Sequence, residues 1–117
     1  MPLPSDQLER LTEMDSENPT LRFALGQAYL EAGRFAEAAG ALERAVALNP
    51  LYTAAYWPLG KALEGAGRLA EALATYERGI GVGETTRDVI PTQKMRARLR
   101  RLKKQQTGSD DEGVSGS

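Results

Sequence analysis

Residues 25–38 read LGQAYLEAGRFAEA, and residues 59–72, one period of 34 positions later, read LGKALEGAGRLAEA. The likeness extends outward without a gap, because residues 19–50 laid over residues 53–84 give eleven identities in thirty-two positions. A fixed period of this length is typical of repeat proteins, in which each unit buries its apolar face against its neighbours. The sequence therefore predicts two copies of one structural unit.

Each copy has apolar residues at helical spacing on both sides of a glycine, Gly33 or Gly67. Glycine suits the left-handed residue that commonly ends a helix, so each unit reads as a helix, a tight turn and a second helix. Small residues such as Gly26, Gly60 and Ala38 would let the two helices of a unit approach closely.

This pattern resembles the tetratricopeptide repeat. The first unit carries the family's residues at Leu25, Gly26, Tyr29, Ala38, Leu42, Ala45 and Pro50, and the second carries them at Tyr56, Leu59, Gly60, Ala72 and Tyr76. The departures are Arg22 at an aromatic position, Leu63 for Tyr, Gly79 for Ala and Glu84 for Pro. The resemblance implies an all-α fold, a right-handed superhelical stack of antiparallel helix pairs.

The chain divides into five segments on this interpretation. Residues 18–51 and 52–85 are the two units, and residues 1–17 are a half repeat, because Leu8-Glu9-Arg10 precedes Leu42-Glu43-Arg44 by one period. Residues 86–106 form a basic capping helix, with Met95, Leu99 and Leu102 on one face and Pro91 near its start. Residues 107–117 are too polar to bury anything and predict a disordered tail.

Two details of the second unit are expected to be irregular. Gly79, Gly81 and Gly83 favour an early end of its second helix, because glycine is a poor helix former. Pro58 removes a backbone donor near the start of its first helix, and we interpret it as a proline tolerated in the first helical turn.

Composition excludes several classes of protein. The chain has no cysteine and no histidine, which removes disulfides, thiol chemistry and the commonest general base and metal ligand. We therefore expect no enzyme activity, no metal site and no cofactor. The N-terminus lacks the basic start and apolar run of a secretory signal, and no run of 18 apolar residues occurs, so the expected location is the cytoplasm.

The resemblance also implies where a partner would bind. In the family, positions 2, 5, 9 and 12 of each unit commonly face a concave groove. In this chain they are Thr20, Phe23, Gln27, Leu30, Ala54, Trp57, Lys61 and Glu64. Phe23 and Trp57 stand one period apart and would form an aromatic pair on the groove floor, the kind of residue that anchors a peptide; the alternative is that they pack against a neighbouring repeat or the C-terminal helix.

The family's best-known ligand device is a clamp of Lys, Asn and Arg on the C-terminal carboxylate of a chaperone. This chain has Phe23, Gln27, Trp57 and Lys61 at the matching positions, so a mainly apolar or mixed protein or peptide ligand fits better. Lys61 would hold an acidic group at the edge.

Seven of the fifteen basic residues lie between positions 94 and 104, where there is no acid: Lys94, Arg96, Arg98, Arg100, Arg101, Lys103 and Lys104. They are either the solvated face of a capping helix or a patch for nucleic acid or an anionic membrane, although aromatic residues for base stacking are absent from it. A further alternative to groove binding is self-association, because so short an array leaves its end helices uncovered.

Overall fold

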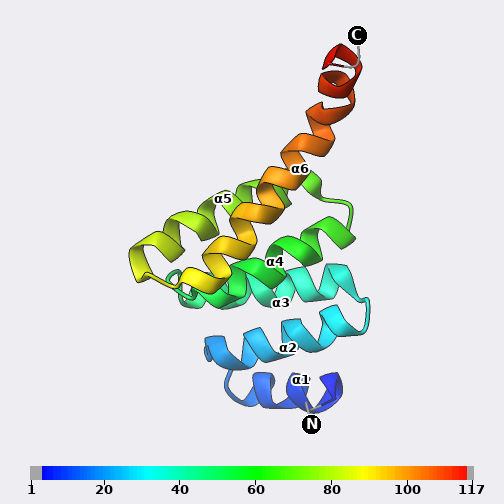
Figure 1. Ribbon diagram of the computed structural model, residues 1–117. Helices are drawn as coiled ribbons and strands as arrows, with labels where there is room; N and C mark the ends of the chain where they lie inside the picture. Colours follow the sequence, from blue (N-terminus) through cyan, green and yellow to red (C-terminus); the bar gives the residue numbers. More distant parts are fainter. Residues whose placement is uncertain (1–3, 116–117) are drawn as a thin grey trace.

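The computed structural model describes the backbone of residues 4–115 and the side chains of residues 4–106. The described backbone consists of helices and their connections (Figure 1): α1 (Ser5–Met14), α2 (Pro19–Glu31), α3 (Phe35–Leu48), α4 (Thr53–Gly65), α5 (Leu69–Thr86) and α6 (Val89–Ser115). The predicted all-α fold is confirmed. The pairs α2–α3 and α4–α5 are the two repeats, flanked by α1 at one end of the stack and α6 at the other.

Local sequence signals set the boundaries of the repeat helices. Asn18 caps α2, since its side-chain oxygen accepts hydrogen bonds from the amides of Thr20 and Leu21 and Pro19 follows as the first helical residue. Gly33 and Gly67 end the first helix of each repeat with φ of 75° and 78°. This left-handed conformation lets the chain reverse within a few residues, so the helices of a pair run antiparallel.

Glycines also set how closely the paired helices approach. A Cβ atom on Gly60 would lie 2.1 Å from Cε1 of Tyr76, and one on Gly26 would lie 2.4 Å from Cγ of Leu42. The ring of Tyr76 and the side chain of Leu42 are fully buried. Each large side chain of a second helix therefore fills the space that a glycine leaves on the first helix, as the sequence predicts.

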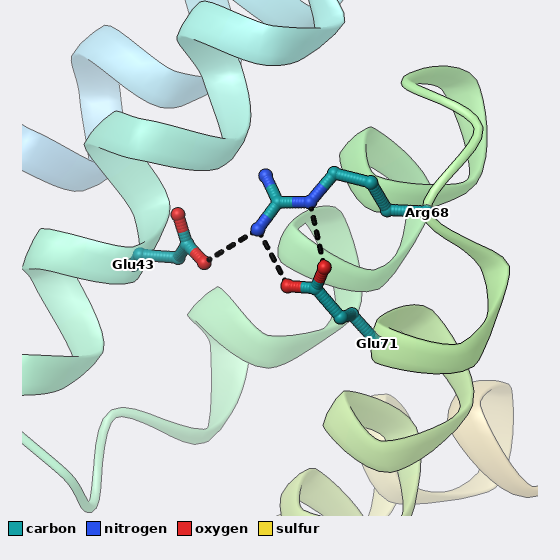
Figure 2. A network of polar contacts seen from close by, with 3 residues as sticks. All are labelled: Glu43, Arg68 and Glu71. Carbon is teal, nitrogen blue, oxygen red and sulfur yellow. Dashed lines mark hydrogen bonds and ion pairs between the residues drawn. The ribbon is translucent and has the colours of Figure 1, made fainter.

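Charged side chains link one repeat to the next at the surface. Arg68, at the start of α5, donates from Nε to Glu71 at 3.0 Å and from Nη2 to Glu43 of α3 at 3.4 Å (Figure 2). One period earlier, Arg34 pairs with Glu37 in the same way. The contact with Glu43 connects the two repeats across the α3–α4 boundary.

The prediction that α5 would end early is wrong, because α5 continues through all three glycines to Thr86. Gly79 and Gly83 face α6: a Cβ on Gly79 would lie 2.5 Å from Sδ of Met95, and one on Gly83 would lie 1.8 Å from Oγ1 of Thr92. The close packing of α6 that these glycines allow outweighs their low helix propensity.

Pro58 also differs from its interpretation as a first-turn residue. It is the sixth residue of α4, inside a continuous helix, and it is buried. Since proline has no N–H, the carbonyl of Ala54 receives no helical hydrogen bond from it. The helix nevertheless continues past the buried ring to Gly65.

The face of α6 that the sequence assigns to the interior is buried as predicted. Met95 is 0% exposed and Leu102 is 4% exposed, and Leu99 packs against the same core. Beyond residue 106 the structure differs from the predicted disordered tail, because α6 continues to Ser115. No proline follows Pro91, so the backbone hydrogen bonds of α6 are not interrupted by a residue without an N–H. The parts of the end segments at residues 1–3 and 116–117 lie outside the described residues.

Candidate functional site

The inner surface of the stack holds a cavity of about 400 Å³ between α2, α4 and the start of α6. Five of the eight predicted groove residues line it together with Pro58 and four residues at the start of α6: Phe23, Gln27, Ala54, Trp57, Lys61, Pro58, Asp88, Ile90, Pro91 and Lys94. The lining thus comes from both repeats and from the C-terminal helix.

Phe23 and Trp57 are both half-buried, and both line this cavity. Each ring stacks on a tyrosine: Phe23 lies 5.1 Å from Tyr52, centroid to centroid, and Trp57 lies 5.8 Å from Tyr76. Tyr52 lies directly before α4, and Tyr76 lies on α5. Phe23 and Trp57 therefore pack against neighbouring parts of the stack and also face the cavity, so the two interpretations of these rings do not exclude each other. The tyrosines fix the orientation of the aromatic floor.

Positive charge lies over that floor. Lys61 places its Nζ atom 5.2 Å from the centroid of the Trp57 ring, within the range of a cation–π contact. Lys94 lines the same cavity from α6, and Asp88 contributes one carboxylate near the beginning of that helix. An apolar floor with two exposed lysines suits a ligand that combines an apolar side chain with an acidic group.

Glu64, also predicted as a groove residue, does not line this cavity and is hydrogen-bonded to α5 and α6. Its Oε2 atom accepts a hydrogen bond from Tyr76 Oη at 2.6 Å and another from Arg98 Nε at 3.1 Å. Burial opposes ionisation of Glu64, but the hydrogen bonds from Arg98 and Tyr76 outweigh it and hold the pKa of its carboxyl below the ordinary value. Burial, followed by the bond to Glu64, raises the pKa of Tyr76. Glu64 therefore fastens α6 to α4 and is not a free groove residue.

The other two predicted groove residues lie outside the cavity. Thr20 lines a second cavity of about 360 Å³, which shares Phe23 and Gln27 with the first and reaches Leu8 of α1. Leu30 is half-buried and packs against the core. The groove thus continues toward α1 through Thr20, while Leu30 packs against the core with part of its side chain exposed.

Comparison with known proteins decides the family. A family model described as "Tetratricopeptide repeat" matches residues 6–43 and 23–83, which together cover both repeats and most of α1. The chain belongs to the tetratricopeptide repeat (TPR) family. Members of this family are typically interaction modules without catalytic activity. No curated protein matches the chain.

Solved structures with a similar fold align with most of the chain. A Bordetella parapertussis protein whose solution structure is known is 31% identical, with a TM-score of 0.77 over 92% of this chain and 93% of its own. The first TPR of Spaghetti (RPAP3), bound to the HSP90 peptide SRMEEVD, is 28% identical with a TM-score of 0.76 over 88% of this chain and 77% of its own. A TPR domain protein from Salinibacter ruber is 27% identical, with a TM-score of 0.68 over 74% of this chain and 96% of its own.

The TPR period explains why α6 contributes to the site, although the sequence analysis left it out of the groove. Counting one further period of 34 from Ala54 and Trp57 reaches Asp88 and Pro91, which both line the cavity. The same count from Lys61 and Glu64 reaches Met95, which is buried, and Arg98, which binds Glu64. Extending the repeat by one more period would therefore have identified Asp88 and Pro91, two of the four lining residues that come from the start of α6.

The seven basic residues of α6 lie in different surroundings. Arg98 pairs with Glu64 and Arg96 pairs with Glu84 of α5, while Lys94 lines the cavity. The remaining four are exposed: Arg100, Arg101, Lys103 and Lys104. At least two of the seven charges are therefore used within the molecule, which weakens the case for one continuous surface for nucleic acid or membrane.

Other kinds of site find no support in the described part of the chain. Residues 4–106 contain no group of three His, Cys, Asp or Glu side chains placed to hold a metal ion. None of the helices described is both long and apolar enough to cross a membrane.

Proposed function

We propose that this TPR stack binds a peptide or protein segment in the cavity between α2, α4 and α6, with an apolar side chain on the aromatic floor and an acidic group beside the lysines. The observation that carries the proposal is that three helices line one cavity with apolar side chains: Phe23 from α2, Trp57 from α4 and Ile90 from α6. A concave site with an apolar base and a few polar groups is the usual form of a ligand site.

Rigid aromatic anchors support a peptide as the ligand. Phe23 and Trp57 are held by tyrosines at 5.1 and 5.8 Å, so little rotamer entropy is lost when a ligand covers them. Their partly exposed faces offer apolar area to a side chain of the ligand.

The two lysines give the ligand its expected charge. Lys61 and Lys94 reach the cavity from facing helices, and Asp88 balances only one of them. An acidic residue next to the apolar anchor would lie between them. The peptide-bound TPR of Spaghetti supports a peptide as the class of partner, whereas Phe23, Gln27 and Trp57 at the clamp positions favour a more apolar contact here.

The binding experiment uses the single tryptophan of the chain as its reporter. Peptides selected from a displayed random library would be titrated while the fluorescence of Trp57 is followed. The expected ligands carry an aromatic or large aliphatic residue flanked by Asp or Glu and change this fluorescence. Phe23→Ala should weaken their binding by at least about tenfold, since truncating an interface hot spot costs roughly 2 kcal/mol or more.

Matched variants separate the groove from general effects. Leu51→Ala shortens an exposed apolar residue that does not line the cavity, and it should leave binding unchanged. Lys61→Ala should weaken acidic peptides more than their Asn or Gln counterparts. If peptides bind Phe23→Ala as well as the wild type, with helicity intact by circular dichroism, the groove assignment is wrong.

A further inference from the structure

The two ends of the stack are the complementary halves of one repeat. α1 corresponds to a second helix: Leu8 lies one period before Leu42 and is likewise buried, and Glu9 one period before Glu43. α6 corresponds to a first helix, because it packs on α5 and α4 in the way that α4 packs on α3 and α2. Among the described helices, α1 is therefore a second helix without a first, and α6 is a first helix without a second.

The two ends also carry opposite charge. Residues 5–18 contain five carboxylates and one arginine, whereas residues 89–106 contain seven basic residues and no acid. In the structure α1 and α6 lie at opposite ends of the stack, which extends 59 Å along its longest axis (Figure 1). The ends therefore cannot neutralise each other within one molecule but can do so between molecules.

The charged side chains lie on the outward faces of these helices. On α1, Leu8 and Thr12 are buried against α2, and the opposite side of the helix presents Asp6, Arg10, Glu13 and Met14 to solvent, with Arg10 3.9 Å from Asp6. Met14 is 83% exposed, the most exposed of the large apolar side chains described. This face is acidic with an apolar residue near its C-terminal end.

On α6 the outward face is basic. Met95, Leu99 and Leu102 point into the core, so Arg100, Arg101 and Lys104 lie on the opposite side and are exposed. Val89, 58% exposed, lies at the beginning of the same helix. This face thus has an apolar residue near its N-terminal end and positive charge further along.

We propose that copies of this chain stack head to tail, with the outward face of α6 on α1 of the next copy, so that the two helices complete a repeat between molecules. Paired helices of a repeat run antiparallel, which places Met14 beside Val89. Asp6 is eight residues from Met14, or about 12 Å along the helix, and Arg100 is eleven residues from Val89, or about 16 Å. The acidic end of α1 then faces the basic part of α6.

Such a contact uses different surfaces on the two copies, so it leaves a free acidic end and a free basic end and can add further copies. Its strength depends on salt, because the Debye length falls from about 30 Å at ~0.01 M to about 3 Å at ~1 M ionic strength. The contact is separate from the groove floor at Phe23 and Trp57, so groove binding and stacking can be tested apart.

Two charge-reversal variants test the proposal. Asp6→Lys with Glu13→Lys makes the outward face of α1 basic like that of α6, and Arg100→Glu with Arg101→Glu makes the outward face of α6 acidic like that of α1. Molar mass would be measured by sedimentation at low and high salt while protein concentration is raised. The wild type should rise above the monomer mass of 12.7 kDa at low salt and return to it at high salt. Each variant alone should associate at least about tenfold more weakly, because like charges then meet.

The decisive sample is an equal mixture of the two variants. Each basic α1 can then meet an acidic α6, and each acidic α1 a basic α6, so association should return to the wild-type level. The control is Glu77→Lys with Arg44→Glu, exposed residues on α5 and α3, which should associate like the wild type. A wild type that remains monomeric at low salt, or a mixture that fails to associate while both variants keep wild-type helicity, would overturn the proposal.

Discussion

At the scale of single residues, Glu64 is a partly buried side chain whose ionisation is linked to the packing of α6. Its folded-state pKa is lowered by Arg98 and Tyr76 against the effect of burial. Its contribution is therefore fully present above the ordinary carboxyl pKa and is lost as pH falls through the lower folded-state value. The docking of α6 should weaken in acid for this reason.

Replacing Glu64 tests this dependence. Glu64→Gln should lower the free energy of unfolding by about 1–3 kcal/mol at neutral pH, because it removes charge-assisted hydrogen bonds from a half-buried group. The difference from wild type should shrink as pH falls below the ordinary carboxyl range. Urea unfolding at neutral and acid pH measures it. Glu77→Gln, on the exposed surface of α5, serves as the control, and a pH-independent difference at position 64 would contradict the assignment.

Arg87 is the one residue other than glycine with positive φ in the described backbone, at 60° between α5 and α6. A side chain in this left-handed region is strained, and Gly33 and Gly67 show the residue that the conformation prefers. Arg87→Gly should therefore raise the free energy of unfolding by about 1 kcal/mol, measured by urea denaturation. Gly67→Ala should change stability with the opposite sign; an unchanged or less stable Arg87→Gly would show that the arginine side chain makes a compensating contact.

At the scale of elements, the contact between α5 and α6 depends on which face of α5 a glycine occupies. A Cβ on Gly81 would meet nothing within 4 Å, whereas one on Gly83 would lie 1.8 Å from Oγ1 of the buried Thr92. Gly81→Ala should stabilise the protein by about 0.5–1 kcal/mol through helix propensity. Gly83→Ala should destabilise it by about 1–3 kcal/mol through overpacking.

The two substitutions differ by two residues in one helix, so each is the control for the other. Thermal unfolding followed by circular dichroism gives the order of stability, and the expected order is Gly81→Ala, wild type, Gly83→Ala. Equal effects of the two alanines would mean that α6 does not pack on α5 as the structure has it.

The same elements show how much the sequence could predict. The 34-residue period predicted the helix pairs and their left-handed glycine turns, and the i, i+4, i+7 spacing of Met95, Leu99 and Leu102 predicted the interior face of α6, because these features depend on local spacing. The period could not predict that α5 continues through Gly79 and Gly83, since that depends on the fit of Met95 and Thr92 from a helix further along the chain. The hydrogen bond between Glu64 and Arg98 was not predicted for a similar reason, because Arg98 lies 34 residues away on α6.

At the scale of the whole molecule, the helices differ in how many neighbours hold them. α1 packs only on α2, whereas α4 packs on α2, α3, α5 and α6 among the described helices. Backbone amides of α4 should therefore exchange slowest with solvent deuterium and those of α1 fastest. Hydrogen exchange followed by mass spectrometry of peptides from each helix measures this order.

A single substitution tests whether α1 opens independently of the other helices. Glu9→Ala removes the acceptor of the 2.6 Å hydrogen bond from Tyr29 Oη, which links α1 to α2. Exchange in α1 should become faster, whereas exchange in α5 should stay the same because α5 does not contact α1. Faster exchange throughout the molecule would instead indicate that the stack opens as one cooperative unit.

The order of packing along the chain has a consequence for how the protein is made. Every helix contact joins helices that are adjacent in sequence or separated by one, so each segment leaving the ribosome meets partners that have already emerged. The first repeat can fold while the second is still being translated. The cavity wall formed by Ile90, Pro91 and Lys94 follows both repeats in the sequence, so a growing chain acquires the complete lining of the proposed site only after the start of α6 has left the ribosome.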